Sequence, residues 1–162
     1  MRLTVYTDFS LRVLMFLAVK GDGLATIAEI AKAYGISKNH LMKVTHQLGR
    51  AGYLETVRGK GGGMRLAQRP QDIVIGEVVR RTEPDMAIVP CFAPDGDSAI
   101  CAILPSCALP AALSRARDAF LSALDEHTLA DLVRPRAPLR KLLSFNPNGS
   151  AATKTSQSAR RA

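Results

Sequence analysis

A chain of 162 residues, of which 47% are hydrophobic, is long enough for one domain with appendages and can supply a buried core. No run approaches the roughly eighteen apolar residues of a membrane span, and the apolar stretch 13–19 follows the charged Asp8 and Arg12, which a signal peptide would not carry. We therefore expect neither a membrane protein nor a secreted one. The odd number of cysteines, three, fits a reducing compartment, so the expected location is the cytoplasm.

The formal net charge of +8 is distributed unevenly along the chain. Residues 37–70 hold seven basic side chains and one acidic side chain, whereas residues 71–131 hold four basic and ten acidic ones. Residues 132–162 are basic again. A basic block beside an acidic one is typical of a phosphate-binding face, although a solvated surface is the ordinary fate of Lys and Arg. This segregation favours nucleic acid as the partner.

Three helices are predicted in the first third of the chain. Residues 8–20 form the first, since a mostly apolar run is followed by glycines. Thr26 opens the second with a capping-box pattern, and Gly35 ends it. Ser37 is the N-cap of a third helix, expected over residues 38–51, whose apolar residues recur at helical spacing.

The second and third helices predict a helix-turn-helix over about residues 26–51, because a short turn containing glycine joins them. Its second helix offers groups that reach phosphates and base edges. The predicted DNA contacts here are Ser37, Lys38, Asn39, His40 and Lys43. An ordinary helical hairpin within a bundle is the alternative, but the basic side chains fall on the second helix specifically.

Residues 53–66 predict a β-hairpin, because two β-prone runs flank a glycine-rich connection. The connection is basic, so its backbone and Lys60 can approach a phosphate closely. The predicted DNA contacts of this hairpin are Arg58, Lys60, Gly61 and Arg65. A nucleotide-binding loop is disfavoured, since the order of a Walker A motif is absent and a strand follows the glycines. Beside a helix-turn-helix, such a hairpin is a wing.

The rest of the chain predicts a helix over 73–81, a cysteine-containing loop over about 86–109 and a long amphipathic helix over about 110–127. A long Ala/Leu-faced helix in a small protein commonly pairs with its twin, so we expect a dimerisation helix. Packing of this helix on the first helix is the alternative. Residues 134–162 are expected to form a basic, disordered tail.

Cys91, Cys101 and Cys107 are the only cysteines and fall within one loop-like segment. Thiolates gathered in a flexible loop are typical ligands for a soft metal or a cluster. Their spacing, C-x9-C-x5-C, matches neither a C-x2-C zinc pair nor the usual ferredoxin runs. Redox-active thiols, a partial disulfide and plain buried cysteines remain as alternatives.

Four motifs occur in order: T-D-F-S-L-R, G-I-S-K-N-H-L-M-K-V, R-G-K-G-G-G and the three-cysteine loop. On these motifs, residues 1–143 resemble the winged-helix iron–sulfur regulators of transcription, and among them the nitric-oxide-sensitive repressors. The resemblance implies a homodimer that holds a 2Fe-2S or 4Fe-4S cluster. The implied ligands are Cys91, Cys101, Cys107 and the partner subunit's Asp8, with Arg12 holding the Asp8 carboxylate. The interval between the first two cysteines is longer than is usual in that family.

The predicted fold is mainly α with a small β-hairpin: a winged helix-turn-helix DNA-binding domain over 1–133 with a long dimerisation helix. The predicted function is a repressor that binds an inverted-repeat operator in double-stranded DNA and releases it when nitric oxide attacks the cluster. An iron- or redox-responsive regulator is one alternative, and a DNA-binding protein stapled by zinc or thiols is another. No arrangement typical of an enzymatic site stands out.

Overall fold

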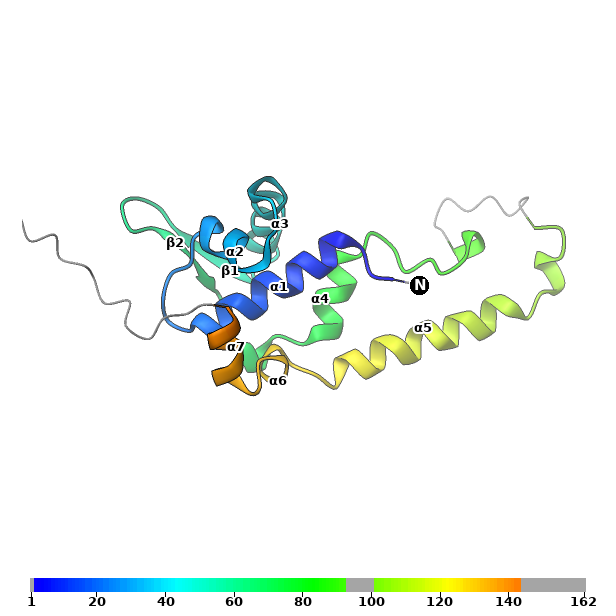
Figure 1. The fold of residues 1–162 in the computed structure, drawn as a ribbon. Coiled ribbons are helices and arrows are strands. Elements are labelled where there is room, and N and C mark those ends of the chain that lie inside the picture. Colours follow the sequence, from blue (N-terminus) through cyan, green and yellow to red (C-terminus); the bar gives the residue numbers. More distant parts are fainter. Residues whose placement is uncertain (1, 93–100, 144–162) are drawn as a thin grey trace, which may run out of the picture.

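The fold is organised around one long helix, α1 (Val5–Lys20), which the other elements surround (Figure 1). The computed structural model describes residues 2–92 and 101–143. Helix α1 begins three residues earlier than predicted, because the Thr4 hydroxyl accepts a hydrogen bond from the Thr7 amide at 3.2 Å and so caps the helix. Its fully buried side chains, which include Leu14 and Phe16, form the centre of the hydrophobic core.

Helices α2 (Ile27–Tyr34) and α3 (Lys38–Arg50) form the helix-turn-helix. The capping box at the start of α2 is present, and Gly35 ends the helix in the left-handed conformation at φ 65°. The apolar stripe of α3 is buried against α1, with Leu41 entirely shielded from solvent. The core therefore holds α3 along one side and leaves its opposite side exposed.

Strands β1 (Leu54–Val57) and β2 (Gly63–Leu66) pair antiparallel and form the wing. The wing is joined to the helix-turn-helix by two backbone hydrogen bonds between Ala25 and Met64, at 2.8 and 2.9 Å. This junction requires glycine at position 63, because a Cβ atom there would lie 2.7 Å from the Ala25 carbonyl oxygen. Part of the glycine run thus serves the fold, and its remainder forms the tip of the wing.

After the wing come α4 (Ile75–Thr82), α5 (Leu109–Asp125) and α6 (Leu129–Leu132). Short 3-10 turns occupy Pro70–Asp72, Pro90–Phe92 and Leu104–Ser106. Helix α4 begins two residues later than predicted, since Val74 forms a β-bridge with Thr128. Figure 1 shows α5 extending beyond the body formed by α1–α4, with the cysteine-bearing segment at its far end.

The disordered tail is predicted to begin at residue 134, but Arg136–Leu142 forms a further helix, α7. Arg136 and Arg140 donate hydrogen bonds to the Val19 carbonyl oxygen at 3.2 and 3.1 Å, so they satisfy the C-terminal end of α1. Leu139 packs against the core. The rest of the tail predicted to be disordered, 144–162, lies outside the described residues, as does the middle of the cysteine loop, 93–100.

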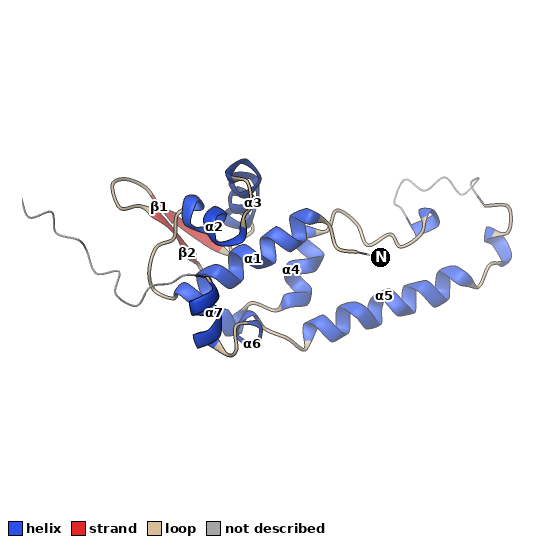
Figure 2. Cartoon of the chain, viewed as in Figure 1, coloured by secondary structure: helices blue, strands red, loops and turns tan. Residues whose placement is uncertain are grey.

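The predicted fold class is confirmed: in the part of the chain that the structure describes, helix predominates and the strands are confined to one hairpin (Figure 2). Over the described ranges, no helix has the length and apolar character needed to cross a membrane.

Candidate DNA-binding surface and thiol site

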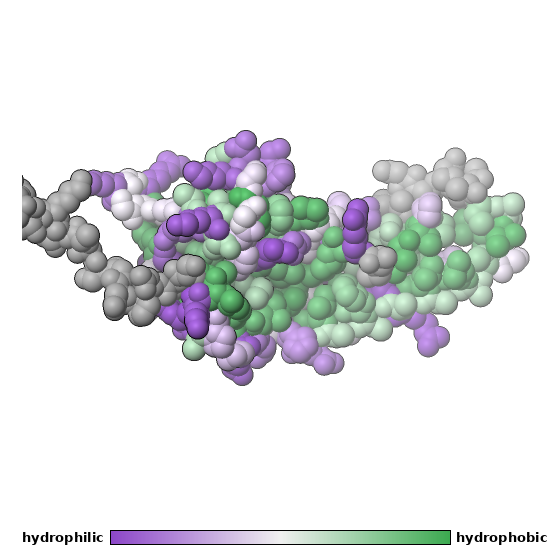
Figure 3. Space-filling model, viewed as in Figure 1, coloured by the Kyte–Doolittle hydropathy of each residue, from purple (hydrophilic) through white to green (hydrophobic). Residues whose placement is uncertain are grey.

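The outer side of α3 is mostly polar and exposed, and it carries four of the nine predicted DNA contacts. Lys38, Asn39, His40 and Lys43 are all exposed, and Figure 3 shows hydrophilic side chains covering this part of the molecule. Ser37 has a different position, because its hydroxyl accepts a hydrogen bond from the His40 amide at 3.3 Å and so caps the helix. The side that faces away from the core can therefore meet a polyanion without rearrangement.

The wing tip adds a second cationic surface to that of α3. Arg58, Lys60 and Gly61 are exposed there, and Gly61 has the positive φ of 82° that lets the chain turn. Arg65 differs from these residues, because its guanidinium donates to the Glu55 carboxylate directly across the hairpin. Binding a phosphate through Arg65 would compete with that ion pair.

Helix α1 contacts the helix-turn-helix beside Asp8. The Arg12 guanidinium donates to the Asp8 carboxylate at 3.0 Å and lies 5.8 Å from the centre of the Tyr34 ring. Burial raises the pKa of Tyr34, and the charge of Arg12 opposes that rise. The rings of Phe9 and His40 lie 6.1 Å apart. The predicted Asp8–Arg12 pair is therefore present. Arg12 reaches Tyr34 of α2, and Phe9, next to Asp8, reaches His40 of α3.

The three cysteines line one cavity of about 230 Å³, which we call the thiol cavity. Its other walls are almost entirely apolar and consist of Val89, Pro90, Ile103, Leu104, Leu109 and Pro110. Cys91 is exposed, while Cys101 and Cys107 are half-buried. Within the described part of the chain, no three Cys, His, Asp or Glu side chains lie close enough together to hold a metal ion. The thiols thus share a space without converging, and Asp8 does not line it.

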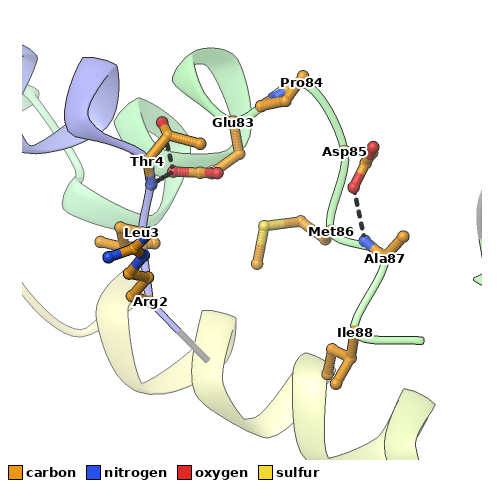
Figure 4. Close-up of a pocket in the computed structure, with 9 residues that line it drawn as sticks. All are labelled: Arg2, Leu3, Thr4, Glu83, Pro84, Asp85, Met86, Ala87 and Ile88. Carbon is orange, nitrogen blue, oxygen red and sulfur yellow. Dashed lines mark hydrogen bonds between the residues drawn. The ribbon is translucent and has the colours of Figure 1, made fainter. Parts of the chain in front are cut away.

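Two contacts that sequence reasoning missed hold the segment leading into the thiol cavity. The Thr4 amide and hydroxyl donate to Glu83 Oε1 at 2.8 and 3.1 Å, which joins the end of α4 to the start of α1 (Figure 4). A cavity of about 320 Å³ lies between these two segments. Further along, the Arg117 guanidinium of α5 lies 5.8 Å from the centre of the Phe92 ring, next to Cys91. Thr4 and Glu83 are 79 residues apart, so no local pattern could have indicated their contact.

Helix α5 carries an exposed apolar face. This helix, which the structure describes in full, buries Leu121 alone. Positions three and four residues apart share a side of a helix, so Leu109, Leu113, Ala116 and Phe120 form one stripe, which we call the α5 face. Leu109 and Ala116 are exposed, and Leu113 and Phe120 are half-buried. Leu109 is 56% exposed, and nearby Ile103 is 66% exposed. Figure 3 shows a band of hydrophobic side chains reaching the far end of α5. A face of this kind indicates an interaction surface.

The winged helix-turn-helix with its cationic outer side defines a DNA-binding regulator of transcription. Residues 3–135 match the family Rrf2, described as iron-dependent transcriptional regulator, and the chain belongs to this family. The chain is 54% identical over 146 residues to the HTH-type transcriptional regulator NsrR of Bacillus subtilis (strain 168), which covers 90% of this chain and 99% of that relative. The resemblance drawn from the sequence motifs is therefore confirmed, and the chain is a transcription regulator, not an enzyme.

Solved structures agree with this family assignment. CymR, the global cysteine regulator of B. subtilis, has a TM-score of 0.64 at 27% identity, over 82% of this chain and 95% of CymR. IscR of T. potens has a TM-score of 0.66 over 86% of this chain and 91% of IscR. At 23% identity, the second likeness bears on the fold alone.

Proposed function

We propose that this chain is a homodimeric repressor that releases its operator when nitric oxide reacts with an iron–sulfur cluster held by Cys91, Cys101, Cys107 and the partner subunit's Asp8. The observation that carries the proposal is that all three cysteines line one apolar-walled cavity. The high identity to a relative named NsrR supports it further.

The thiol cavity suits a cluster in its chemistry. Thiolates are the ligands that iron–sulfur clusters prefer, and apolar walls limit the access of water. When bound, the cluster would supply iron atoms to which nitric oxide can bind, and the partner subunit's Asp8 would add a carboxylate to the three thiolates. The chain contributes three soft donors that line one cavity, and cluster binding would require the three sulfur atoms to be brought together there.

The surface beside Asp8 supports a ligand donated by a second subunit. Val5, Asp8 and Arg12 lie on one side of α1, and the Val5 side chain is 65% exposed. The Asp8 side chain is itself 46% exposed. A second copy that covers the α5 face and Val5 would bury apolar surface that is now in water, and its α5 and cysteine segment would then approach Asp8. The dimer thus accounts for both the unpaired helix face and the missing fourth ligand.

Helix α1 gives this arrangement a route to DNA. Arg12 contacts both Asp8 and Tyr34, and Phe9 contacts His40 at the start of α3. A carboxylate drawn toward the partner subunit weakens its bond to Arg12, so the packing of α1 against the helix-turn-helix differs between the two states. Ligand binding and DNA binding then bias one equilibrium. Two-fold symmetry places the two copies of α3 on an inverted-repeat operator with half-sites about one helical turn apart.

The test is to purify the protein anaerobically and record its visible spectrum, its iron and sulfide content and its DNA binding before and after nitric oxide. We expect broad visible absorption that changes with nitric oxide, and a parallel loss of operator binding. Colourless protein with stoichiometric zinc would exclude the cluster.

The family description as iron-dependent favours a second candidate, a regulator that responds to iron supply. Removing iron with a chelator in the absence of nitric oxide separates the two. An iron-responsive regulator changes its operator affinity at chelator concentrations that mimic iron limitation, whereas a nitric oxide sensor keeps its cluster and its affinity under those conditions.

A further inference from the structure

An open groove of about 440 Å³ lies between the recognition helix α3 and the wing, and we call it the reading groove. It is lined by Thr26, Ile27, Ala28, Lys38, Met42, Val57, Gly63 and Met64. Two of its walls are large apolar side chains in contact with solvent, since Met42 is 50% exposed and Val57 is 44% exposed. Met42 lies on α3 and Val57 on β1, the elements predicted to contact DNA.

Core packing does not require an apolar side chain at position 42. The buried stripe of α3 is formed by Leu41, Val44, Thr45 and Leu48, and Met42 lies on the side of the helix that faces the wing. Its exposed neighbours, Lys38 and Lys43, are cationic. A single apolar side chain on a surface is normal, but Met42 and Val57 are exposed together on one groove, and an exposed apolar surface of this kind fits an apolar partner outside the chain.

We infer that Met42, with Val57 as the opposite wall of the reading groove, packs against thymine 5-methyl groups and selects thymine at one position of each operator half-site. The inference rests on entry of α3 into the major groove, as in the proposed function. The thymine methyl is the apolar mark that distinguishes base pairs in the major groove. Methionine suits this contact because its flexible, polarisable side chain adapts to a partner of irregular shape.

The charges around the reading groove favour DNA over an apolar peptide or a second copy of the chain. Lys38 lines the groove itself, Lys43 follows on the exposed side of α3, and Arg58 and Lys60 lie at the wing tip. An apolar protein surface seated here would desolvate several cations without partners, which is costly. A DNA duplex places phosphates beside those cations and base methyls beside Met42.

The experiment begins with duplexes selected from a random pool by the anaerobically purified protein. Each thymine of a recovered half-site is then replaced by deoxyuridine, which removes the methyl group alone. Burying one methyl corresponds to about fourfold in affinity. We expect the wild-type protein to lose roughly that factor at one thymine per half-site. Met42→Ala should bind the thymine and deoxyuridine duplexes equally, and Met42→Leu should retain the preference.

Two controls separate this reading from general DNA binding. Lys43→Ala should weaken binding to both duplexes alike and leave their ratio unchanged. Val57→Thr, which keeps the side-chain volume but adds a hydroxyl, should reduce the ratio in part. If the wild-type protein binds all deoxyuridine duplexes as tightly as the thymine duplex, the inference is wrong although DNA binding stands. If no duplex is recovered, the proposed operator binding and this inference fail together.

Discussion

The DNA-reading half of the molecule, α1–α3 with the wing, is complete within one chain, whereas the half formed by the cysteine segment and α5 is not. Each helix of the reading half has a side-chain cap, and its apolar stripes meet in one core. Helix α5 has no side-chain cap at its start, buries one residue and carries an exposed apolar face. The three thiols share a cavity but do not converge.

The difference between the two halves indicates which of them would respond to the signal in the proposed mechanism. A half that is satisfied by its own packing keeps its shape in every state, because rearranging it would break buried contacts. In the proposed mechanism, a half with exposed apolar surface and unassembled ligands gains stability when a second subunit and a cofactor bind. In that mechanism the signal acts on the incomplete half, and α1 transmits its effect to the complete one.

The strongest test of this division is removal of a thiol. Cys101→Ala should abolish the visible absorption and the bound iron, because a cluster requires its full set of thiolate ligands. The thermal unfolding of the reading half should change little, since Cys101 makes no part of the core. Absorption spectroscopy, iron analysis and circular dichroism measure these effects. If Cys91→Ala keeps the full spectrum, the ligand set differs from the one proposed.

The α5 face can be tested by adding a charge to it. Ala116→Glu places a carboxylate on the exposed apolar stripe, where it would be buried in a dimer, so we expect the dissociation constant of the dimer to rise by at least about tenfold. Ser122→Glu is the matched control, because Ser122 is exposed on the other side of the same helix. Analytical ultracentrifugation decides the outcome. Equal effects of the two changes would contradict dimerisation through this face.

Asp8 lies on α1 and is the proposed link between the two halves. Replacing it shows whether its carboxylate is a cluster ligand or only stabilises the start of the helix. A carboxylate in the first turn contributes about 0.3–1 kcal/mol through the helix dipole, and Asp8→Ala should cost no more than this in the apo-protein. If Asp8 is a cluster ligand, Asp8→Ala should also make the cluster labile.

Mixed dimers then show which subunit donates the carboxylate. One subunit carries Asp8→Ala together with all three cysteines replaced, and the other is unaltered. A ligand donated across the dimer leaves this heterodimer without a complete ligand set, so its cluster should be labile. One fully stable cluster per heterodimer would show that Asp8 is not a ligand donated across the dimer.

A smaller effect is expected at the wing. Lys60→Ala should lower the slope of the logarithm of DNA affinity against the logarithm of salt concentration by about 1, because one phosphate contact is lost. Arg65→Ala should lower it less, since the Arg65 guanidinium is already paired with Glu55. Fluorescence anisotropy over a range of salt concentrations measures both slopes. Arg65 having the larger effect would mean that this ion pair opens on DNA.

The smallest effect concerns the link between α4 and α5. Arg80 donates to both carboxylate oxygens of Asp125 at 2.7 and 2.6 Å, and these hydrogen bonds hold the pKa of Asp125 below its ordinary value of 3.8. Because the folded-state pKa is lowered, the stabilisation is present above pH 3.8 and is lost as the pH falls through the folded-state pKa. Asp125→Asn should therefore lower the melting temperature slightly at neutral pH and not at the acidic end. Arg80→Ala should reproduce this pH dependence, and the double variant should add nothing.

Much of the reading half was predictable from the sequence, because its signals act within one or two turns. A helix starts where a Thr or Ser side chain accepts a hydrogen bond from the backbone amide three residues later. It ends where a glycine adopts the left-handed conformation. These rules located the helix-turn-helix. The β-prone runs around a glycine-rich connection located the wing, and helical periodicity set the basic residues of α3 opposite its apolar stripe. This periodicity also placed Asp8 one turn from Arg12, and the structure contains that ion pair.

Only the tertiary structure determined the contacts between residues far apart in the chain. The Thr4–Glu83 hydrogen bonds, the seating of α7 on the end of α1 and the apolar walls of the thiol cavity depend on the path of the whole backbone. The reading groove is of the same kind, since Met42 and Val57 become two walls of one groove only after the wing folds back beside α3. Local hydrogen bonds and helical periodicity act over a few residues, and they carry no information about which distant surfaces the core brings together.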